Sequence, residues 1–327
     1  MKLGAIIGSV ALLSACSSTG GAAKTESSAA NVASGGVDTP KMVVAMVTHG
    51  APGDTFWDLV RKGAEDAAKK NNMELRYSSD PQAPNQANLV QAAIDAKVDG
   101  IVVTLPNADA IGPAAKKAVD AKIPTVALNA GMEEYKNYNI SGFFGQEEKV
   151  AGTQGGVRLA EDGAKHVLCV IHEQGNSSQE SRCAGVAEGL DGNGKVEILY
   201  VNGQDLTSVQ STLKAKLAQE KNIDWIMSLQ ASVAMRAVDA VDEAGAAAKV
   251  ATFDTNAELV DAIAANKIAW AIDQQPYLQG YMAIDSLWLA KRNGATVGGG
   301  RPVYTGPSFV DSSNVELIAE AAKAGLR

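Results

Sequence analysis

The stretch MVVAMVTHGAPGDTFWDLVRKGAEDAAKK, residues 42–70, decides the fold. Residues 42–47 form an apolar run that predicts a buried strand, and residues 55–70 have the spacing of an amphipathic helix. Asp54 or Thr55 can cap this helix, because a side-chain oxygen there can accept a free amide of the first turn. A buried strand that leads through a Gly- and Pro-containing loop into a helix is typical of a doubly wound α/β sheet.

Two aromatic residues, Phe56 and Trp57, follow at the carboxyl end of this predicted strand. Ligands of doubly wound sheets bind at that edge. Asp54 could accept two hydroxyl hydrogen bonds there, while the two rings cover the C–H face of a sugar. The alternative is that both rings are ordinary core residues. The stretch alone does not decide between these interpretations.

Residues 1–15 have the features of a secretory signal peptide: one early Lys, an apolar run and small residues before Cys16. The run is shorter than the roughly 20 apolar residues that span a membrane. The sequence LSAC at 13–16 resembles the bacterial lipobox, in which the cysteine thiol is acylated before cleavage. We therefore expect export and a lipid anchor on Cys16. Residues 16–40 hold almost no large apolar side chains and are predicted to be a flexible tether.

Composition restricts the classes of function. The chain has 327 residues, of which 46% are hydrophobic and only 5% aromatic, and such compositions are common in helix-covered parallel sheets. Without its tether it is long enough for two domains of ordinary size. The formal net charge of −8 provides no basic patch, so we expect no nucleic-acid partner.

Cys169 and Cys183 are the cysteines that remain beside the predicted anchor. An isolated pair outside the cytoplasm can be oxidised. We place Cys169 within a strand and Cys183 near the start of the next helix, a spacing that a strand–loop–helix return can bridge. We predict a disulfide, which would contribute roughly 3 kcal/mol in the chain-entropy model. The alternative is two buried thiols that act as small hydrophobic side chains.

Strands and helices alternate over the rest of the chain in two series, which predicts parallel sheets with right-handed crossovers. The first series has predicted strands at 42–47, 74–78, 101–104 and 125–128, with helices at 55–70, 85–96 and 109–121. The second has strands at 139–144, 166–172, 197–201, 225–229 and 250–253, with helices at 146–160, 178–189, 207–220 and 231–244.

The last segments, a helix at 256–265, a strand at 268–272 and a helix at 277–291, are too short for a third domain. They must complete the first two, so the chain crosses between domains more than once. The expected fold is α/β, with two doubly wound parallel-sheet domains, a multi-strand hinge and a ligand cleft between them. We predict a first lobe of 41–145 plus about 275–305, and a second of 146–274 plus about 306–327.

Five stretches in this order resemble the periplasmic sugar-binding proteins of ABC importers, of the ribose- and galactose-binding type with the type I periplasmic binding protein fold. They are GDTFWDLVRKGAEDAA, DGIVVTLPNADAIGPAAKKAVDAKIPTVALN, RCAGVAEGL, VATFDTN and AWAIDQQPYLQGYMA. The resemblance covers the chain from Lys41 onward. It implies a monomeric solute-binding protein that captures a sugar or polyol by hinged closure and delivers it to an ABC permease in the membrane.

The resemblance also implies ligand contacts at strand ends and helix starts. Asp54 matches the family's carbohydrate-binding Asn or Asp, and Phe56 and Trp57 match its stacking aromatics. Asn129 stands where the family has an acidic residue, and Ala130 stands where it often has Arg, which suggests a polyol or a sugar other than the commonest pentoses. The other implied positions are Gln146, Arg182, Gln230, Phe253, Asp254 and Gln274. His49, at the tip of the first strand, is a further candidate ligand residue.

Enzyme signatures are weak by comparison. GTQGG at 152–156 superficially resembles a dinucleotide loop, but it lies inside a helical pattern and lacks the full spacing. His49, His166 and His172 are not at metal-ligand spacing, and a G-x-S-x-G elbow is absent. We therefore expect no enzyme, metal or cofactor. The runner-up is a receptor of the same fold that reports its ligand to a membrane sensor, and export with no helix-turn-helix before Met42 argues against a repressor.

Overall fold

The computed structural model describes residues 39–327. The predicted signal peptide, the lipidated Cys16 and nearly all of the predicted tether lie outside the described residues. No helix within 39–327 combines the length and the apolar character that crossing a bilayer requires.

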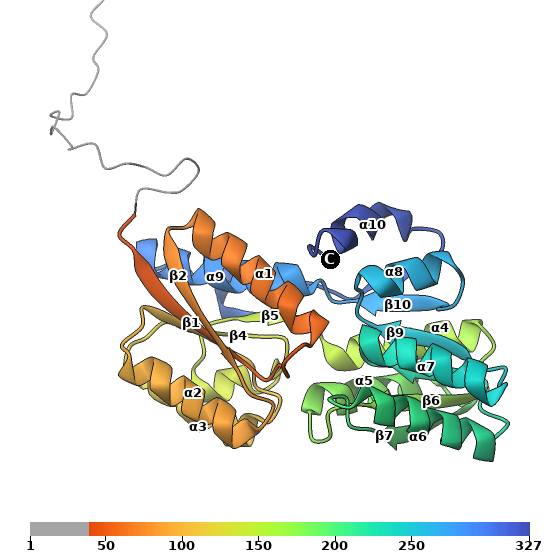
Figure 1. The fold of residues 1–327 in the computed structure, drawn as a ribbon. Helices are drawn as coiled ribbons and strands as arrows, with labels where there is room; N and C mark the ends of the chain where they lie inside the picture. Colours follow the sequence, from red (N-terminus) through yellow and green to blue (C-terminus); the bar gives the residue numbers. More distant parts are fainter. Residues whose placement is uncertain (1–38) are drawn as a thin grey trace, which may run out of the picture. The chain divides into compact units, whose positions relative to one another are not determined.

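Lobe 1 is built on a six-stranded sheet in which all strand pairs are parallel. Its strand order is β11-β5-β4-β3-β1-β2, with bounds Met42–Thr48 (β1), Met73–Ser79 (β2), Gly100–Val103 (β3), Thr125–Leu128 (β4), Phe143–Gly145 (β5) and Val303–Tyr304 (β11). One face is covered by α1 and α9 and the other by α2 and α3, as Figure 1 shows. These helices are Thr55–Lys70 (α1), Ala83–Asp95 (α2), Ala108–Asp120 (α3) and Pro276–Asn293 (α9), with short 3-10 helices at Tyr135–Tyr138 and Val297–Gly300.

Lobe 2 repeats this plan with the strand order β12-β10-β9-β8-β6-β7. Its strands are His166–Ile171 (β6), Lys195–Tyr200 (β7), Trp225–Ser228 (β8), Lys249–Phe253 (β9), Trp270–Asp273 (β10) and Ser308–Asp311 (β12). Its helices are Glu148–Glu161 (α4), Ser177–Leu190 (α5), Leu206–Gln219 (α6), Ala231–Ala244 (α7), Ala257–Ala264 (α8) and Glu316–Lys323 (α10). The central strands β6, β8 and β10 are buried along their whole length, whereas β7 at the edge has only exposed and half-buried residues.

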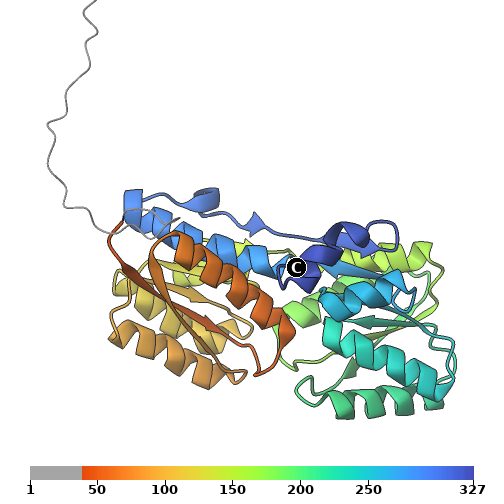
Figure 2. The same cartoon turned by 45° about the horizontal axis from the view of Figure 1, so that its top comes forward.

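Two helices are exchanged between the lobes. α4 follows β5 of the first sheet but packs beside α5 on lobe 2, and α9 follows β10 of the second sheet but packs beside α1 on lobe 1 (Figures 1 and 2). Both helix pairs approach closely at glycines. A Cβ atom on Gly63 of α1 would lie 1.9 Å from the Tyr277 carbonyl oxygen, and one on Gly152 of α4 would lie 2.2 Å from the Arg182 carbonyl oxygen. A larger residue at either place would push the helices apart.

Three segments join the lobes within the described residues: β5 to α4, β10 to α9, and β11 to β12. They are bonded to one another at Thr305, whose backbone N–H donates to the Gly145 carbonyl at 2.7 Å and whose hydroxyl donates to the Gln274 carbonyl at 2.7 Å. Beside them, the Arg327 Nε donates to the buried Asp273 carboxylate at 2.6 Å. These hydrogen bonds hold the three crossing segments side by side.

The disulfide ties the sheet of lobe 2 to α5. Cys169 of β6 and Cys183 of α5 are joined through their sulfurs, with Cα atoms 5.9 Å apart and both side chains fully buried. Cys183 is the seventh residue of α5, which begins one residue before the predicted start.

Three predictions about elements need correction. The expected strand at 139–144 is reduced to β5, because residues 139–142 form a turn and an irregular segment after the 3-10 helix. The helix expected from Gln146 begins at Glu148. The short β11, β12 and α10 were not predicted, and β12 runs antiparallel to β10, so the second sheet is not purely parallel. β11 and β12 have one fully buried residue between them, which is too weak a pattern to be recognised in the sequence.

Candidate functional site

The predicted ligand residues gather where the strands of the two sheets end. We call this set the interface site. It contains side chains that follow β1, β4, β8, β9 and β10, together with others from the loops and helices beside them: His49, Asp54, Asn129, Gln146, Arg182, Gln230, Phe253, Asp254 and Gln274. Side chains from opposite lobes bond directly to each other there. The backbone also joins the lobes, since the Ser177 N–H donates to the Pro106 carbonyl at 3.1 Å.

Asp54 links the start of α1 to lobe 2. Its Oδ1 accepts from the Phe56 N–H at 3.0 Å, which caps α1, and its Oδ2 accepts from Gln230 Nε2 at 2.8 Å. Burial raises the pKa of Asp54 to about 6, and repulsion from the Glu173 carboxylate adds to the shift. Asp54 thus caps its helix and still presents an acceptor to the other lobe.

A chain of side-chain amides connects the tips of β4 and β9. Asn129 Nδ2 donates to Gln274 Oε1 at 3.0 Å, and Gln274 Nε2 donates to Asp254 Oδ1 at 2.7 Å. Burial raises the pKa of Asp254 to about 7, although the charge of Arg182 opposes the shift. Asp254 does not cap the following helix, a role taken by Asn256, whose Oδ1 accepts from the Leu259 N–H at 2.8 Å. Its carboxyl is therefore free of a capping role.

Arg182 lies on α5, and its guanidinium forms an ion pair with the Glu148 carboxylate. Its Nε and Nη2 donate to the two Glu148 oxygens at 2.6 and 2.9 Å, and its Nη1 donates to the Leu229 carbonyl at 3.3 Å. The guanidinium lies 4.6 Å from the centre of the Phe253 ring. Gln146 Nε2 also donates to Glu148, at 2.8 Å. The side chains of Gln146 and Phe253 thus contact one buried ion pair, Glu148 with Arg182.

His49 contacts side chains of both lobes. Its Nδ1 is 2.7 Å from Thr104 Oγ1, and its Nε2 is 3.4 Å from Asn176 Nδ2 and 3.6 Å from Glu173 Oε2. Burial lowers the pKa of His49 and lowers that of His172, at the end of β6, to about 4. Both imidazoles are therefore neutral near pH 7.

Phe56 and Trp57 lie in the core of lobe 1, with 7% and 5% of their surface exposed. The Trp57 ring meets the His49 ring edge-on at 4.7 Å and the Phe56 ring at 5.1 Å. In this arrangement the two rings support the loop that carries Asp54. Their contact with a ligand stays a prediction.

Several residues of the interface site were missed by sequence reasoning. Glu148, Glu173, His172 and Asn176 each sit at a helix start or strand end, but nothing in their local sequence distinguishes them from solvated surface residues. A signal for Glu148 did exist. The glycines of GTQGG at 152–156 are spaced for close helix packing, and such packing places α4 beside α5.

Within residues 39–327, one cluster could offer metal ligands. The ligand atoms of His166, Glu197 and Glu220 lie within 4.8 Å of one another. The Lys216 ammonium, however, contacts both carboxylates and already supplies the positive charge between them. His166 begins β6, so the cluster lies at the opposite end of the sheet from the interface site. We assign no metal to it.

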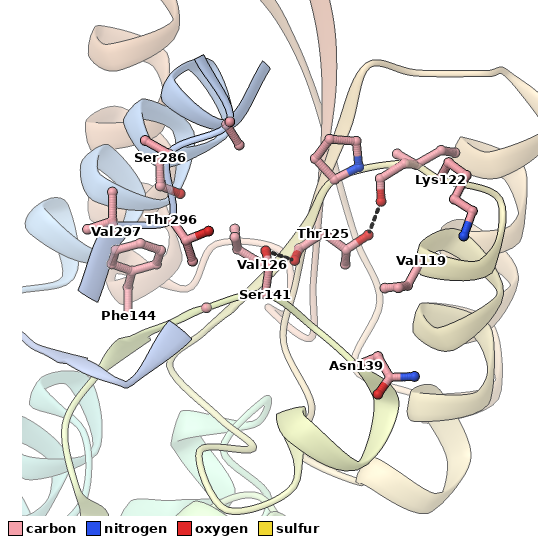
Figure 3. A pocket seen from close by; sticks show the side chains of 16 residues that line it. Val119, Lys122, Thr125, Val126, Asn139, Ser141, Phe144, Ser286, Thr296 and Val297 are labelled. Carbon is pink, nitrogen blue, oxygen red and sulfur yellow. Dashed lines mark hydrogen bonds between the residues drawn. The ribbon is translucent and has the colours of Figure 1, made fainter. Parts of the chain in front are cut away.

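A cavity of about 310 Å³ lies at the amino end of β4, again away from the interface site (Figure 3). Its walls are largely apolar and include Val126, Phe144 and Val297. The polar atoms at its edge bond within the lobe, as where the Ser141 hydroxyl donates to the Thr125 carbonyl at 2.8 Å. It offers few groups that could fix the orientation of a polyol.

Comparison with known proteins identifies the family. A family model described as "periplasmic binding protein domain" matches residues 44–295. Among curated proteins, the xylose/arabinose-binding protein XylF of Sulfolobus acidocaldarius is 22% identical over 305 residues, covering 87% of this chain and 74% of that protein. The xylitol-binding protein of Mycolicibacterium smegmatis is 25% identical over 57% of this chain and 54% of its own length.

Among solved structures, a carbohydrate transporter from Acidothermus cellulolyticus 11B in complex with myo-inositol is 50% identical, with a TM-score of 0.87. The match covers 88% of this chain and 100% of that one. These are solute-binding transport proteins and not enzymes. The family model spans well over half of the chain, and the two-lobed α/β fold agrees with it, so this chain belongs to the periplasmic binding proteins.

Proposed function

We propose that this protein captures a polyol or sugar between its lobes and delivers it to an ABC permease. A cyclitol such as myo-inositol is the favoured ligand, because that compound is bound in the structure that is 50% identical. The observation that carries the proposal is the set of direct bonds between the lobes, Asp54 to Gln230 and Asn129 through Gln274 to Asp254.

These side chains suit neighbouring hydroxyl groups. A carboxylate accepts several hydrogen bonds, and an amide both donates and accepts, so together they can satisfy the two roles of each hydroxyl. A ligand that enters between the lobes would replace the bonds between Asp54 and Gln230 with bonds of its own. The ligand would then bind more tightly to the conformation in which the lobes are in contact than to one in which they are apart. This difference in affinity couples ligand capture to closure of the lobes.

The first experiment is a thermal-shift screen with myo-inositol, xylitol, arabinose and galactose, followed by calorimetry on the compound that stabilises most. A ligand at 100 times its Kd should raise the free energy of unfolding by about 2.7 kcal/mol. Asp54→Ala should weaken binding, whereas Asp58→Ala, an exposed acid in the same helix turn, should not. If no polyol or sugar stabilises the folded protein, the proposal is wrong.

We further propose that the protein is exported and held at the membrane by a lipid on Cys16, with residues 16–40 as its tether. The support is the lipobox-like LSAC at 13–16, directly after the apolar run. Metabolic labelling with a clickable fatty acid should mark the wild type and not Cys16→Ser. Equal labelling of both proteins would contradict the anchor.

A further inference from the structure

The pairing of Glu148 with Arg182 is fixed by the closest helix contact of lobe 2. Gly152 of α4 packs against the Arg182 carbonyl, and Gly185 of α5 packs against the Lys149 carbonyl, where added Cβ atoms would lie 2.2 and 2.3 Å away. Glu148 is one helical turn before Gly152, so its side chain lies on the same face. The packing of the two backbones thus sets the position of the Glu148 carboxylate beside Arg182.

The carboxylate of Glu148 takes up most of the guanidinium's hydrogen-bonding capacity. Its two oxygens accept from Nε and Nη2 of Arg182, which is the bidentate geometry that makes such pairs strong. With the bond to the Leu229 carbonyl, three of the five guanidinium N–H groups have protein acceptors, and two remain. Arg182 is only 4% exposed, and no other Arg or Lys in residues 39–327 is buried.

The charges around this pair are otherwise negative. The carboxylates of Asp254 and Glu173 both act on the Arg182 charge, and Glu173 also repels Asp54. The neighbouring rings of His49 and His172 are buried and neutral near pH 7. With Arg182 already matched by Glu148, no positive charge of the interface site is left to balance a charged ligand group.

We propose that Glu148 is a specificity-determining residue that confines the interface site to uncharged polyols. The Glu148 carboxylate neutralises the charge of Arg182 and orients its guanidinium so that the two remaining N–H groups donate to ligand hydroxyls. A phosphate or carboxylate group on a ligand would have no unpaired cation to bind. This inference rests on the proposed function and adds the charge class of the ligand to it. Sugar phosphates and uronates are excluded by this arrangement, and cyclitols and neutral sugars are admitted.

The test uses inorganic phosphate as an anion probe and myo-inositol as a neutral one, in calorimetry at constant ionic strength with chloride as the reference salt. Wild-type protein should bind myo-inositol and show no saturable binding of phosphate. Glu148→Gln removes the negative charge but keeps the side-chain length, so it should bind phosphate at least about tenfold more tightly than the wild type. Glu147→Gln makes the same change at the half-buried neighbouring residue and should behave as the wild type.

A second substitution ties the effect to the guanidinium. In the double variant Glu148→Gln/Arg182→Gln the gain in phosphate binding should disappear. If Glu148→Gln does not fold, Glu148→Asp retains the charge but withdraws it by one methylene, and it should gain phosphate binding to a smaller extent.

The outcomes separate the two proposals. Wild-type protein that binds neither myo-inositol nor any other polyol would contradict the proposed function. Wild-type protein that binds a neutral polyol but takes phosphate as tightly as the folded Glu148→Gln or Glu148→Asp variant would overturn the role of Glu148 alone.

Discussion

The two lobes share one strand plan but differ in chemistry at equivalent places. If β1 is matched to β6 and the other strands follow in order, the fourth strands are β4 and β9. Asn129 follows the first of these and Asp254 the second, and both have a left-handed backbone, with φ of 64° and 66°. Asn and Asp tolerate this conformation better than other residues with side chains. The left-handed backbone thus favours Asn or Asp at both positions. Which of the two is present, an amide or a carboxylate, can then be matched to the ligand.

The lobes also differ in how they are held together. Lobe 2 has the Cys169–Cys183 disulfide and a final strand, β12, that runs against its neighbour, whereas the matching β11 of lobe 1 is parallel. Lobe 2 also carries the buried pair of Glu148 and Arg182. Lobe 1 presents an amide and a capping carboxylate, and lobe 2 presents the ionic part of the interface site. We conclude that a symmetric scaffold carries an asymmetric site.

The largest expected difference between the lobes comes from the disulfide. The double variant Cys169→Ala/Cys183→Ala should lower the free energy of unfolding by about 3 kcal/mol, because the unfolded chain regains the freedom of the closed loop. Trp225 and Trp270 lie in the core beside the disulfide, so their fluorescence in a urea titration should report this loss. Wild-type protein in reductant is the control. Full alkylation of both thiols in denatured, unreduced protein would show that the bridge is absent in solution.

The second comparison sets Asp254→Ala against Asn129→Ala. A desolvated carboxylate makes charge-assisted hydrogen bonds of roughly 1.5–3 kcal/mol, so Asp254→Ala should weaken ligand binding about tenfold to a hundredfold. Asn129→Ala removes a neutral amide and should cost about tenfold or less. Calorimetry with the compound found in the screen measures both, and circular dichroism confirms that both variants fold. Wild-type affinity in folded Asp254→Ala would remove this residue from the site.

The smallest effect concerns pH. With a pKa of about 7, native Asp254 keeps a proton that the unfolded chain has lost, so its contribution to stability falls as pH rises through that value. Going from about pH 8 to about pH 6, the wild type should gain about 1.4 kcal/mol relative to Asp254→Asn. The lowered pKa values of His49 and His172 act in the opposite direction in both proteins, which is why the difference between them is measured. If the urea midpoints of the wild type and Asp254→Asn changed by the same amount between these two pH values, the raised pKa of Asp254 would be contradicted.

Much of the fold could be predicted from the sequence because its signals are local. The helices Thr55–Lys70 and Ala231–Ala244 and the strand Thr125–Leu128 have the bounds that periodicity and capping predict. The exchange of α4 and α9 depends on long-range packing, and periodicity shows only that the chain must cross between domains. The short β11 and β12 bury too few side chains for a recognisable pattern.

Those residues of the candidate site that follow strands could be predicted from the sequence. Residues such as Asp54, Asp254 and Gln274 stand at strand ends, where the fold class alone directs attention. Glu148 and Glu173 matter only because the fold places the Glu148 carboxylate beside Arg182 and the Glu173 carboxylate beside His49. A single sequence does not reveal burial of a charge that a distant helix brings about.

The exchanged helices have a consequence for the order in which the protein is made. Lobe 1 draws on residues 42–145 but also on α9 and β11, which are synthesised only after nearly all of lobe 2. An amino-terminal fragment that stops before Pro276 would leave the contact of α1 with α9 unfilled, and its first sheet would lack the final strand. Lobe 2 likewise waits for β12 and α10. Lobe 1 therefore cannot gain α9 and β11 until β10 of lobe 2 has been made, and lobe 2 cannot gain β12 until β11 of lobe 1 has been made.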